Sequence, residues 1–373
     1  MKIAIDARLY GEENGGLGRY VKNLVTELME LDNENRYAVI LRSNYFKRLR
    51  VPKHWEKVEL EVRHYSAKEQ VVVSKVLKKL EPDLVHFPHF NVPLLYRGEY
   101  VVTIHDILMH KVKGKDATTL PKYKYIIKRL GYKKVFSNAV KNANKILVPS
   151  IVAKKDLVNY YKLQPEQVVV TYEGFDAGIT YDGSQEALLR KYGLRKPYFL
   201  YVGNAYPHKN LTRLIEAAKF LNGRGSRAKL AISTARNVFS DRLQREITRL
   251  GANEDVKILG FVPDKEVGGL MEHSHAFVYP SLIEGFGLQG LEAISNGTIL
   301  LASDIPVFKE VYKDNAIYFN PHDFSAIEKA MRDALDLSLK KRKLIIQKAQ
   351  KHIKKYSWDK MAKETLAVYK QAN

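Results

Sequence analysis

Residues 281–293 have the sequence SLIEGFGLQGLEA and directly follow an apolar run that ends at Tyr279. The order of segments predicts a strand, a glycine-rich turn and a helix. At such a junction the backbone N–H groups of the helix N-terminus point beyond the strand end, which suits a diphosphate. Gly285 and Gly287 would let a ligand approach the backbone closely. This stretch therefore predicts an α/β protein with an anion site at a strand end.

Two carboxylates flank the turn, Glu284 before the predicted helix and Glu292 about one and a half turns inside it. At a rise of ~1.5 Å per residue, the two carboxylates would lie roughly 8–12 Å apart. A retaining glycosidase holds its two carboxyl groups about 5–5.5 Å apart. The spacing therefore favours groups that contact the two ends of a nucleotide sugar. The alternative is a helix-capping Glu284 and a solvated Glu292.

Both halves of the chain alternate short β-rich runs with amphipathic helical stretches, a pattern typical of doubly wound α/β domains. In the first half, strands are predicted at Lys2–Ala7, Tyr37–Leu41, Val58–His64, Leu84–Phe87, Tyr100–His105 and Lys145–Pro149. Helices are predicted there at Leu17–Leu31, Glu69–Leu80, Leu120–Asn142 and Ala153–Tyr161. In the second half, strands are predicted at Tyr198–Val202, Lys229–Ser233, Val256–Leu259, Ala276–Tyr279, Ile299–Ser303 and Ala316–Phe319.

The SLIEGFGLQGLEA stretch resembles the E-x7-E signature of retaining GT-B glycosyltransferases of the family 4 type, which include bacterial mannosyltransferases and sucrose and glycogen synthases. The resemblance implies that Glu284 contacts hydroxyls of the donor sugar and that Glu292 holds the ribose. The groups that it places near the diphosphate and sugar are Gly285, Phe286, Gly287 and Leu288.

A second motif, YFLYVGNAYPHKN at residues 198–210, runs from a predicted strand into a helix. Lys209 can pair with phosphate oxygens as leaving-group charge develops, and the helix N-terminus adds partial positive charge. The turn resembles the phosphate-binding turn of the same family, which implies donor contacts from Gly203 and Asn204 as well. Many members of the family have arginine where this chain has Asn204. A second cation for the diphosphate must therefore come from another residue, or the diphosphate is bound without one. A solvated surface lysine is the alternative.

Three further turns come after predicted strands, and ligands of open parallel sheets bind beyond strand ends. The resemblance implies that His105 contacts the donor sugar, although a lone histidine at a strand end more often has a structural role. Asp106 is expected only to cap the next segment of the chain. Gly16 best matches the family's loop that lies over the donor sugar and phosphate. A tight turn between strand and helix is an equal alternative. The spacing of the glycines around Gly16 is not that of the dinucleotide-binding fingerprint. Val262 is expected to read the nucleotide base through its backbone.

The length of 373 residues suits two domains. A Gly- and Asp-rich segment predicts a hinge near Ala177–Gly183. We therefore expect an acceptor-side domain at residues 1–177 and a nucleotide-sugar domain at residues 178–355.

Residues 356–373 are predicted to form a last helix capped by Ser357. In the GT-B proteins that this chain resembles, such a helix crosses back to the first domain. The apolar positions that would then need a surface to cover are Met361, Leu366 and Tyr369.

The composition is that of a globular protein, with 45% hydrophobic and 28% charged residues, which excludes disordered and fibrous classes. No cysteine is present, so disulfides, thiolate metal sites and a thiol nucleophile are excluded, and a reducing compartment fits. The start MKIAID lacks the apolar core of a signal peptide, and no apolar stretch approaches the ~20 residues of a spanning helix. A cytoplasmic location is expected.

The formal net charge of +21 predicts attraction to nucleic acid, anionic lipid or phosphorylated small molecules. Basic residues interleave with aromatic ones at residues 45–50 and at His110–Lys134, and lysines beside aromatic rings suit an anionic headgroup layer. We therefore expect peripheral attachment to the inner face of the cell membrane and a glycan or polyprenyl-diphosphate-linked acceptor. A generally lysine-rich surface is the alternative, which the run Lys340–Lys343 supports.

The family resemblance implies a retaining hexosyltransferase of polysaccharide biosynthesis that uses a nucleotide sugar as substrate and needs neither cofactor nor metal. The PHKN turn resembles that of the family's mannosyltransferases, which favours GDP-mannose as donor over a UDP-hexose. A non-hydrolysing sugar-nucleotide epimerase of the same architecture is a second enzymatic hypothesis. A basic nucleic-acid-binding protein is a third, but the sequence holds no zinc spacing, basic zipper or RNA-binding signature.

Overall fold

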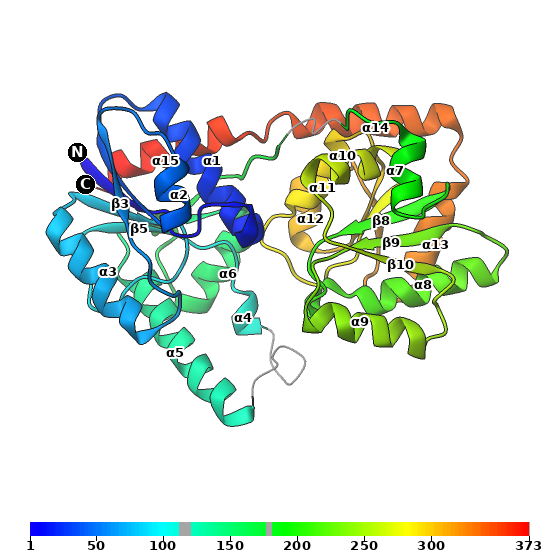
Figure 1. Ribbon diagram of the computed structural model, residues 1–373, viewed down its shortest axis with the longest axis horizontal. Coiled ribbons are helices and arrows are strands. Elements are labelled where there is room, and N and C mark those ends of the chain that lie inside the picture. The colour runs from blue at the N-terminus through cyan, green and yellow to red at the C-terminus, as the bar shows by residue number, and fades with distance from the viewer. Residues whose placement is uncertain (112–120, 177–180, 373) are drawn as a thin grey trace. The chain divides into compact units, whose positions relative to one another are not determined.

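The computed structural model of the chain describes residues 1–111, 121–176 and 181–372. The chain divides into two compact units (Figure 1). Among the described residues, the first unit holds those up to Gly174 and those from Tyr356 on, and the second holds those from Phe175 to Lys355. The boundary predicted at residue 177 lies outside the described residues.

The first unit is built on a parallel sheet with the strand order β3-β2-β1-β4-β5-β6-β7. Its strands are β1 (Lys2–Asp6), β2 (Arg36–Leu41), β3 (Trp55–Glu59), β4 (Leu84–Phe87), β5 (Tyr100–Thr103), β6 (Lys145–Val148) and β7 (Val168–Val170). β1 pairs with both β2 and β4, with Ile5 opposite Val39 and His86, so the strand order reverses between β1 and β4. Ligands of open α/β sheets bind beyond the carboxyl ends at such a reversal.

Helices pack on this sheet with their apolar faces inward. They are α1 (Gly15–Leu31), α2 (Ser43–Arg48), α3 (Ala67–Leu80), α4 (Leu108–Lys111), α5 (Lys122–Lys141), α6 (Ile151–Tyr161) and α15 (Trp358–Gln371), with short 3-10 turns η1 (Glu12–Asn14) and η3 (Pro165–Gln167). The buried residues Val21, Leu24, Val25 and Leu28 of α1 recur at helix spacing, which is why this segment is helical and faces the sheet.

The second unit repeats the design with the order β10-β9-β8-β11-β12-β13. Its strands are β8 (Tyr198–Val202), β9 (Lys229–Ser233), β10 (Val256–Gly260), β11 (Ala276–Tyr279), β12 (Leu300–Ser303) and β13 (Ile317–Phe319). All of the pairings are parallel, and the order reverses between β8 and β11. The predicted fold class, two Rossmann-like α/β units, is therefore confirmed.

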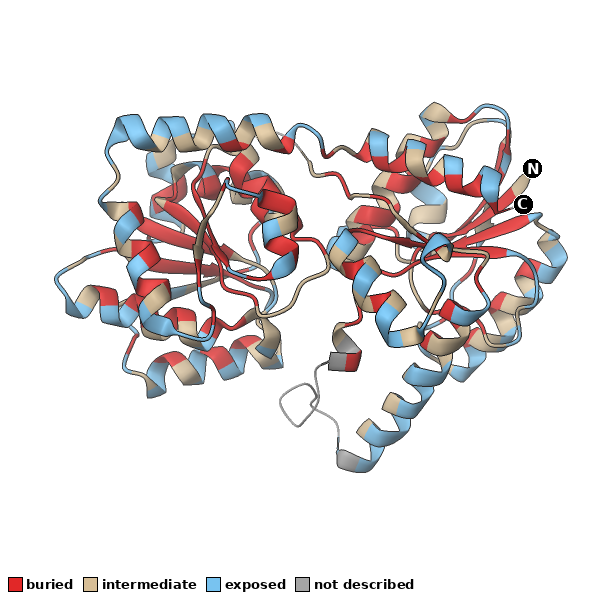
Figure 2. Cartoon of the chain, turned by 180° about the vertical axis from the view of Figure 1, so that it is seen from behind, coloured by how far each residue is buried: buried red, intermediate tan, exposed pale blue. Residues whose placement is uncertain are grey.

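The strands of the second sheet are buried between helices, as Figure 2 shows by their red colour. The helices are α7 (Gln185–Lys191), α8 (Leu211–Gly223), α9 (Val238–Arg249), α10 (Asp264–His273), α11 (Leu288–Ser295), α12 (Pro306–Tyr312), α13 (Phe324–Leu335) and α14 (Leu339–Ile353), with the 3-10 turn η4 (Pro207–Lys209). Among the described residues of both units, no helix combines the length and apolarity that crossing a membrane requires.

The predicted strand Val58–His64 is wrong, because β3 occupies Trp55–Glu59. Trp55 lies opposite Tyr37 of β2 in the ladder, and the two rings stack with centroids 4.2 Å apart. Burial of this aromatic pair starts the strand three residues earlier than the apolar pattern suggests. The prediction also missed β7, a strand of only three residues, and the short α2.

The last helix, α15, belongs to the first unit, where it lies beside α1 (Figure 1). Ser357 caps it as predicted, since its side chain accepts a hydrogen bond from the backbone N–H of Lys360. Met361 and Tyr369 are fully buried, whereas Leu366 is only half-buried. The chain thus returns from the second unit to complete the core of the first.

A buried chain of hydrogen bonds fastens α15 to the sheet. Nδ1 of His86 lies 2.6 Å from the hydroxyl of Tyr369, and its Nε2 lies 2.8 Å from Oγ1 of Thr103. The same Oγ1 lies 3.1 Å from the hydroxyl of Tyr20 on α1. Burial, with a contribution from His105, lowers the pKa of His86 to about 3, so its ring is neutral at physiological pH. A neutral ring both donates and accepts, which suits two hydroxyl partners.

The substitution Tyr369→Phe should lower the free energy of unfolding of the first unit by about 1–3 kcal/mol, because a buried nitrogen of His86 loses its partner. Urea denaturation followed by tryptophan fluorescence measures this directly, since both tryptophans, Trp55 and Trp358, lie in the first unit. The control is Tyr160→Phe, which removes a hydroxyl from a half-exposed ring of the same unit. Equal stability of the two variants would contradict the prediction.

Candidate active site

Two loops that come after the neighbouring strands β8 and β11 lie against each other at the point where the order of the second sheet reverses. The backbone N–H of Leu282 donates to the carbonyl of His208 at 2.8 Å. Nδ2 of Asn210 donates to the carbonyl of Pro280 at 3.1 Å and to that of Pro321 at 2.7 Å. The structure therefore brings together the two motifs that the sequence singled out.

Lys209 and Glu284 form an ion pair where these loops meet. Nζ of Lys209 lies 2.5 Å from Oε1 of Glu284, and the two side chains are only 14% and 13% exposed. The alternative of a solvated Lys209 is therefore wrong. An ammonium group has three N–H donors, so Lys209 can hold Glu284 and still bind an anionic ligand.

Both adjoining helices begin without a side-chain cap. α8 begins at Leu211, after Asn210 in the left-handed conformation at φ 59°, and α11 begins after Gly287 at φ 111°. Lys209 thus lies in the turn η4, two residues before α8. The side chain of Asn210 does not hydrogen-bond to the first turn of α8, and Gly287 has no side chain that could cap α11. The positive end of each helix dipole therefore lies beside the ion pair.

Gly287 occupies a position that has no room for a side chain. A Cβ there would lie 2.3 Å from the hydroxyl of Tyr312 and 2.9 Å from Cε1 of Phe308, both on α12. The same hydroxyl donates to the carbonyl of Gly287 at 2.5 Å. Phe286 and Leu288, on either side, are buried. The predicted donor turn, Gly285 to Leu288, is therefore held in one shape by the packing of α12.

Glu292 lies on the fifth residue of α11 and is only 7% exposed, so the alternative of a solvated Glu292 is wrong. Gly203, at φ 147°, follows β8, and Asn204 is exposed with its carbonyl accepting from the hydroxyl of Tyr201. Val262 follows β10 and is buried. These residues all lie in the second unit, and their contacts with a nucleotide sugar stay predictions.

Sequence reasoning missed three polar groups near the same strand ends. Arg213 lies in the first turn of α8 and donates from Nη1 to Oδ1 of Asn210 at 3.0 Å. Its place in the first turn of the helix that follows the PHKN turn is the signal that could have identified it. The hydroxyls of Ser281 and Thr234, which follow β11 and β9, are buried and have no hydrogen-bond partner among the described residues.

The predicted site residues of the first unit are His105 and Gly16. Nδ1 of His105 lies 2.8 Å from Oε1 of Glu173, and its Nε2 lies 3.1 Å from the carbonyl of Pro88. Asp106 accepts from the backbone N–H of Leu108 at 2.7 Å, as expected of a cap. Gly16 is exposed in the first turn of α1. No sequence pattern pointed to Glu173, which lies far from His105 along the chain.

The pKa of His105 is raised by its partners. Burial by itself lowers this pKa, but the hydrogen bond and charge of Glu173, with the carbonyl of Pro88 and the charge of Asp106, outweigh the burial. Both nitrogens face acceptors, so the protonated ring, with two N–H donors, matches its surroundings. The partners of His105 therefore favour its protonated form.

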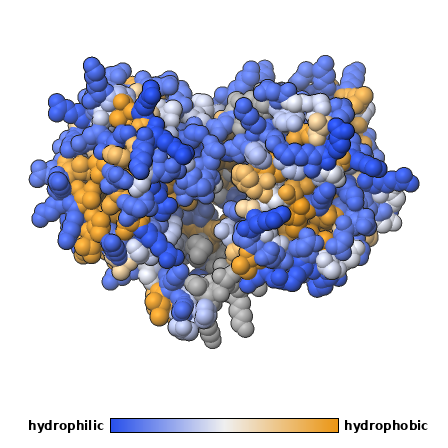
Figure 3. All heavy atoms as spheres, viewed as in Figure 1, coloured by the Kyte–Doolittle hydropathy of each residue, from blue (hydrophilic) through white to orange (hydrophobic). Residues whose placement is uncertain are grey.

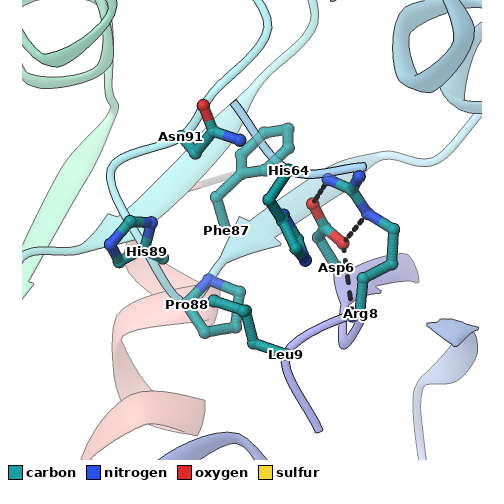
Figure 4. A pocket seen from close by; sticks show the side chains of 8 residues that line it. All are labelled: Asp6, Arg8, Leu9, His64, Phe87, Pro88, His89 and Asn91. Atoms are coloured by element: carbon teal, nitrogen blue, oxygen red, sulfur yellow. Dashed lines mark hydrogen bonds and ion pairs between the residues drawn. The ribbon is translucent and has the colours of Figure 1, made fainter. Parts of the chain in front are cut away.

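A small pocket lies at the carboxyl ends of β1 and β4, where the order of the first sheet reverses (Figure 4). Arg8 crosses it, 2.5 Å from Oδ2 of Asp6 and 2.8 Å from Oε1 of Glu69. All three side chains are at least nine-tenths buried. The pocket is lined by Asp6, Arg8, Leu9, His64, Phe87, Pro88, His89 and Asn91, none of which the sequence singled out.

The substitution Gly287→Ala should destabilise the second unit more than Gly225→Ala does. Both glycines have a positive φ, which costs a Cβ about 1–2 kcal/mol, but only Gly287 also meets neighbouring atoms. Overpacking adds about 1–3 kcal/mol. Chemical denaturation followed by circular dichroism compares the two, and an equal loss would show that the turn can relax away from α12.

The ion pair of His105 predicts a pH dependence of stability. The pKa of His105 is higher in the folded state than the usual ~6.5 of the unfolded chain, so protonation of His105 stabilises the fold. This stabilisation is complete at pH values below ~6.5 and is lost as the pH rises through the folded-state pKa. Glu173→Gln should remove this pH-dependent stabilisation. The difference in free energy of unfolding between wild type and variant should therefore be larger at about pH 5.5 than at about pH 8.5. Tryptophan fluorescence in urea measures both, with the exposed Glu166→Gln as control; a difference that does not depend on pH would contradict the prediction.

Both halves of the chain match known protein families. Residues 184–352 match the family described as glycosyl transferases group 1, and residues 14–178 match glycosyltransferase family 4. The O-antigen chain mannosyltransferase RfbU of Salmonella typhimurium is 27% identical over 74% of this chain and 70% of its own length. The O-antigen chain mannosyltransferase B of Escherichia coli is 28% identical over 79% and 76%.

A solved structure shares the fold of the whole chain. Sucrose-phosphate synthase from Thermosynechococcus elongatus superimposes with a TM-score of 0.77 at 16% identity, over 100% of this chain and 98% of that one. Both halves of the sequence and both sheets thus lead to one conclusion: the chain belongs to the GT-B glycosyltransferases of the family 4 type.

Proposed function

We propose that this glycosyltransferase moves mannose from GDP-mannose, with retention of configuration, to a hydroxyl of a glycan or lipid-linked acceptor. The similarity to two O-antigen chain mannosyltransferases supports mannose as the sugar. The PHKN turn at residues 207–210 supports the same donor. A UDP-hexose is the alternative donor.

The observation that carries the proposal is the ion pair of Lys209 and Glu284 between two uncapped helix starts. In the transfer, the bond between C1 of the sugar and the diphosphate oxygen breaks, and the nucleotide diphosphate leaves with the electron pair. The acceptor oxygen forms the new bond to C1 and releases its proton. Lys209 and the helix dipoles stabilise the departing negative charge, and Arg213 supplies the second cation that Asn204 does not.

The remaining contacts are those that the family resemblance implies. Glu284 accepts hydrogen bonds from sugar hydroxyls, and the buried Glu292 accepts them from the ribose. The backbone of residues 285–288 approaches the diphosphate, while Val262 reads the base through its backbone. Phe261, which is 76% exposed beside Val262, offers a face on which the base can stack. His105 and Gly16 bind the sugar side of the donor.

We infer that the enzyme works on the cytoplasmic face of a membrane, where polyprenyl-diphosphate-linked acceptors are presented. The formal net charge of +21 supports attraction to anionic headgroups. Lys209 and Arg213 already supply positive charge to the diphosphate, so the transfer is expected to proceed without a divalent metal.

Lys209→Met should lower kcat by about 10²–10³-fold, because a charge that stabilises the leaving diphosphate is lost. Glu284→Gln should lower kcat/KM comparably, because the amide cannot accept two hydrogen bonds from the sugar in the same way. Release of GDP from GDP-mannose in the presence of an acceptor measures both. The matched control is Lys329→Met, which removes a 65% exposed lysine of a surface ion pair.

Three controls accompany this assay. Thermal stabilisation by GDP- and UDP-sugars identifies the donor, since a ligand of the folded form raises Tm. EDTA should leave the rate unchanged. Isomerised nucleotide sugar formed from donor alone would support an epimerase instead. Full turnover by both Lys209→Met and Glu284→Gln would overturn the site assignment.

A further inference from the structure

We propose that α5 docks the protein on an anionic lipid surface through an exposed apolar stripe formed by Tyr123, Ile126, Ile127 and Leu130. This inference rests on the proposed function and deepens it by naming the element that meets the membrane. Charge alone did not distinguish membrane binding from a generally lysine-rich surface, whereas the geometry of this helix does.

The stripe residues are large, apolar and exposed. Tyr123 is 62% exposed, Ile126 48%, Ile127 66% and Leu130 64%. Their spacing of three, four and seven positions places them on one face of the helix. A solvated helix has polar residues on its outward face, so a continuous apolar stripe there indicates an interaction surface.

The opposite face of α5 is the one that packs on the sheet. Phe136, Ala139 and Val140 are buried in the core of the first unit. Tyr132 packs against Phe90 with ring centroids 5.0 Å apart and hydrogen-bonds to Nδ1 of His110. At about 100° per residue, these positions lie on the side of the helix away from the stripe. The stripe therefore faces away from its own core.

The figures agree with this arrangement. In Figures 1 and 2, the N-terminal half of α5 projects past the other elements of its unit, and in Figure 2 it is mostly pale blue, that is, exposed. In Figure 3, orange spheres lie among blue ones on this part of the first unit.

The charges beside the stripe identify its partner as anionic. α5 contains no Asp or Glu. The basic residues in this part of the helix are Lys124, Lys128, Arg129, Lys133 and Lys134. Nζ of Lys124 lies 5.8 Å from the centre of the Tyr123 ring, a pairing suited to the headgroup layer. Apolar residues with surrounding cations and no anions complement a bilayer that contains anionic lipid.

Two other basic segments lack this combination. In residues 45–50, the hydroxyl of Tyr45 donates to Glu13 and the ring of Phe46 covers Lys57, so these aromatic rings are engaged within the unit. α14 is basic and free of acidic residues, and its Leu339 and Leu344 are exposed. These two leucines are five positions apart and do not share a face, while Ile345 and Ile346 pack on the core. α14 therefore serves as a matched control.

The test is co-sedimentation of the full chain with vesicles of phosphatidylcholine alone or mixed with phosphatidylglycerol. Wild type should bind the anionic vesicles. The triple variant Ile126→Ser, Ile127→Ser, Leu130→Ser should bind at least about tenfold more weakly, because three apolar side chains no longer enter the bilayer. The control variant Leu339→Ser, Leu344→Ser should bind as wild type does. Circular dichroism confirms that both variants are folded.

Transfer to a short, lipid-free acceptor should be unchanged in the triple variant, so loss of docking and loss of catalysis are measured separately. Absence of wild-type binding to anionic vesicles at low salt would overturn the proposal. Equal binding by the triple variant would assign attraction to the general surface charge and would also overturn it. Sedimentation of wild type as a dimer that the triple substitution dissociates would identify the stripe as a self-association surface instead.

Discussion

The candidate site depends on one constraint, that the two helices which come after the reversal point of the second sheet must begin side by side. Parallel strands place their carboxyl ends at one edge, so α8 and α11 both start there. Asn210 fixes their relation, because its side chain reaches the carbonyls of Pro280 and Pro321 and leaves the first turn of its own helix uncapped. The ion pair of Lys209 with Glu284 can form only in this arrangement.

The turn before α11 is constrained as well, by its packing against α12. Gly287 lies where a left-handed backbone and the hydroxyl of Tyr312 exclude a side chain. The turn is thus shaped before any ligand arrives, and pre-shaped groups need little reorganisation as charge develops on a leaving group. The packing that makes this turn rigid thus also prepares it for the electrostatic stabilisation of the diphosphate that we propose.

In the first unit, buried polar groups hold segments of the chain together. Arg8 is held between two buried carboxylates, His105 is paired with Glu173, and a neutral His86 joins α15 to the sheet. Each group would be costly to bury alone, so each is tied to a partner from another segment. The contact of His86 with Tyr369 makes the return of the chain to the first unit part of its core.

The sequence by itself determined the two Rossmann-like sheets, nearly all of their strands and the loops that carry Lys209 and Glu284. It could do so because apolar periodicity and glycine-rich strand-to-helix turns are local patterns. It did not determine the register of β3, the pairing of His105 with Glu173, the Arg8 cluster or the direction of the α5 stripe. Tertiary structure decided these, because each depends on residues far apart in the chain or on which face of an element the core covers, and local sequence encodes neither.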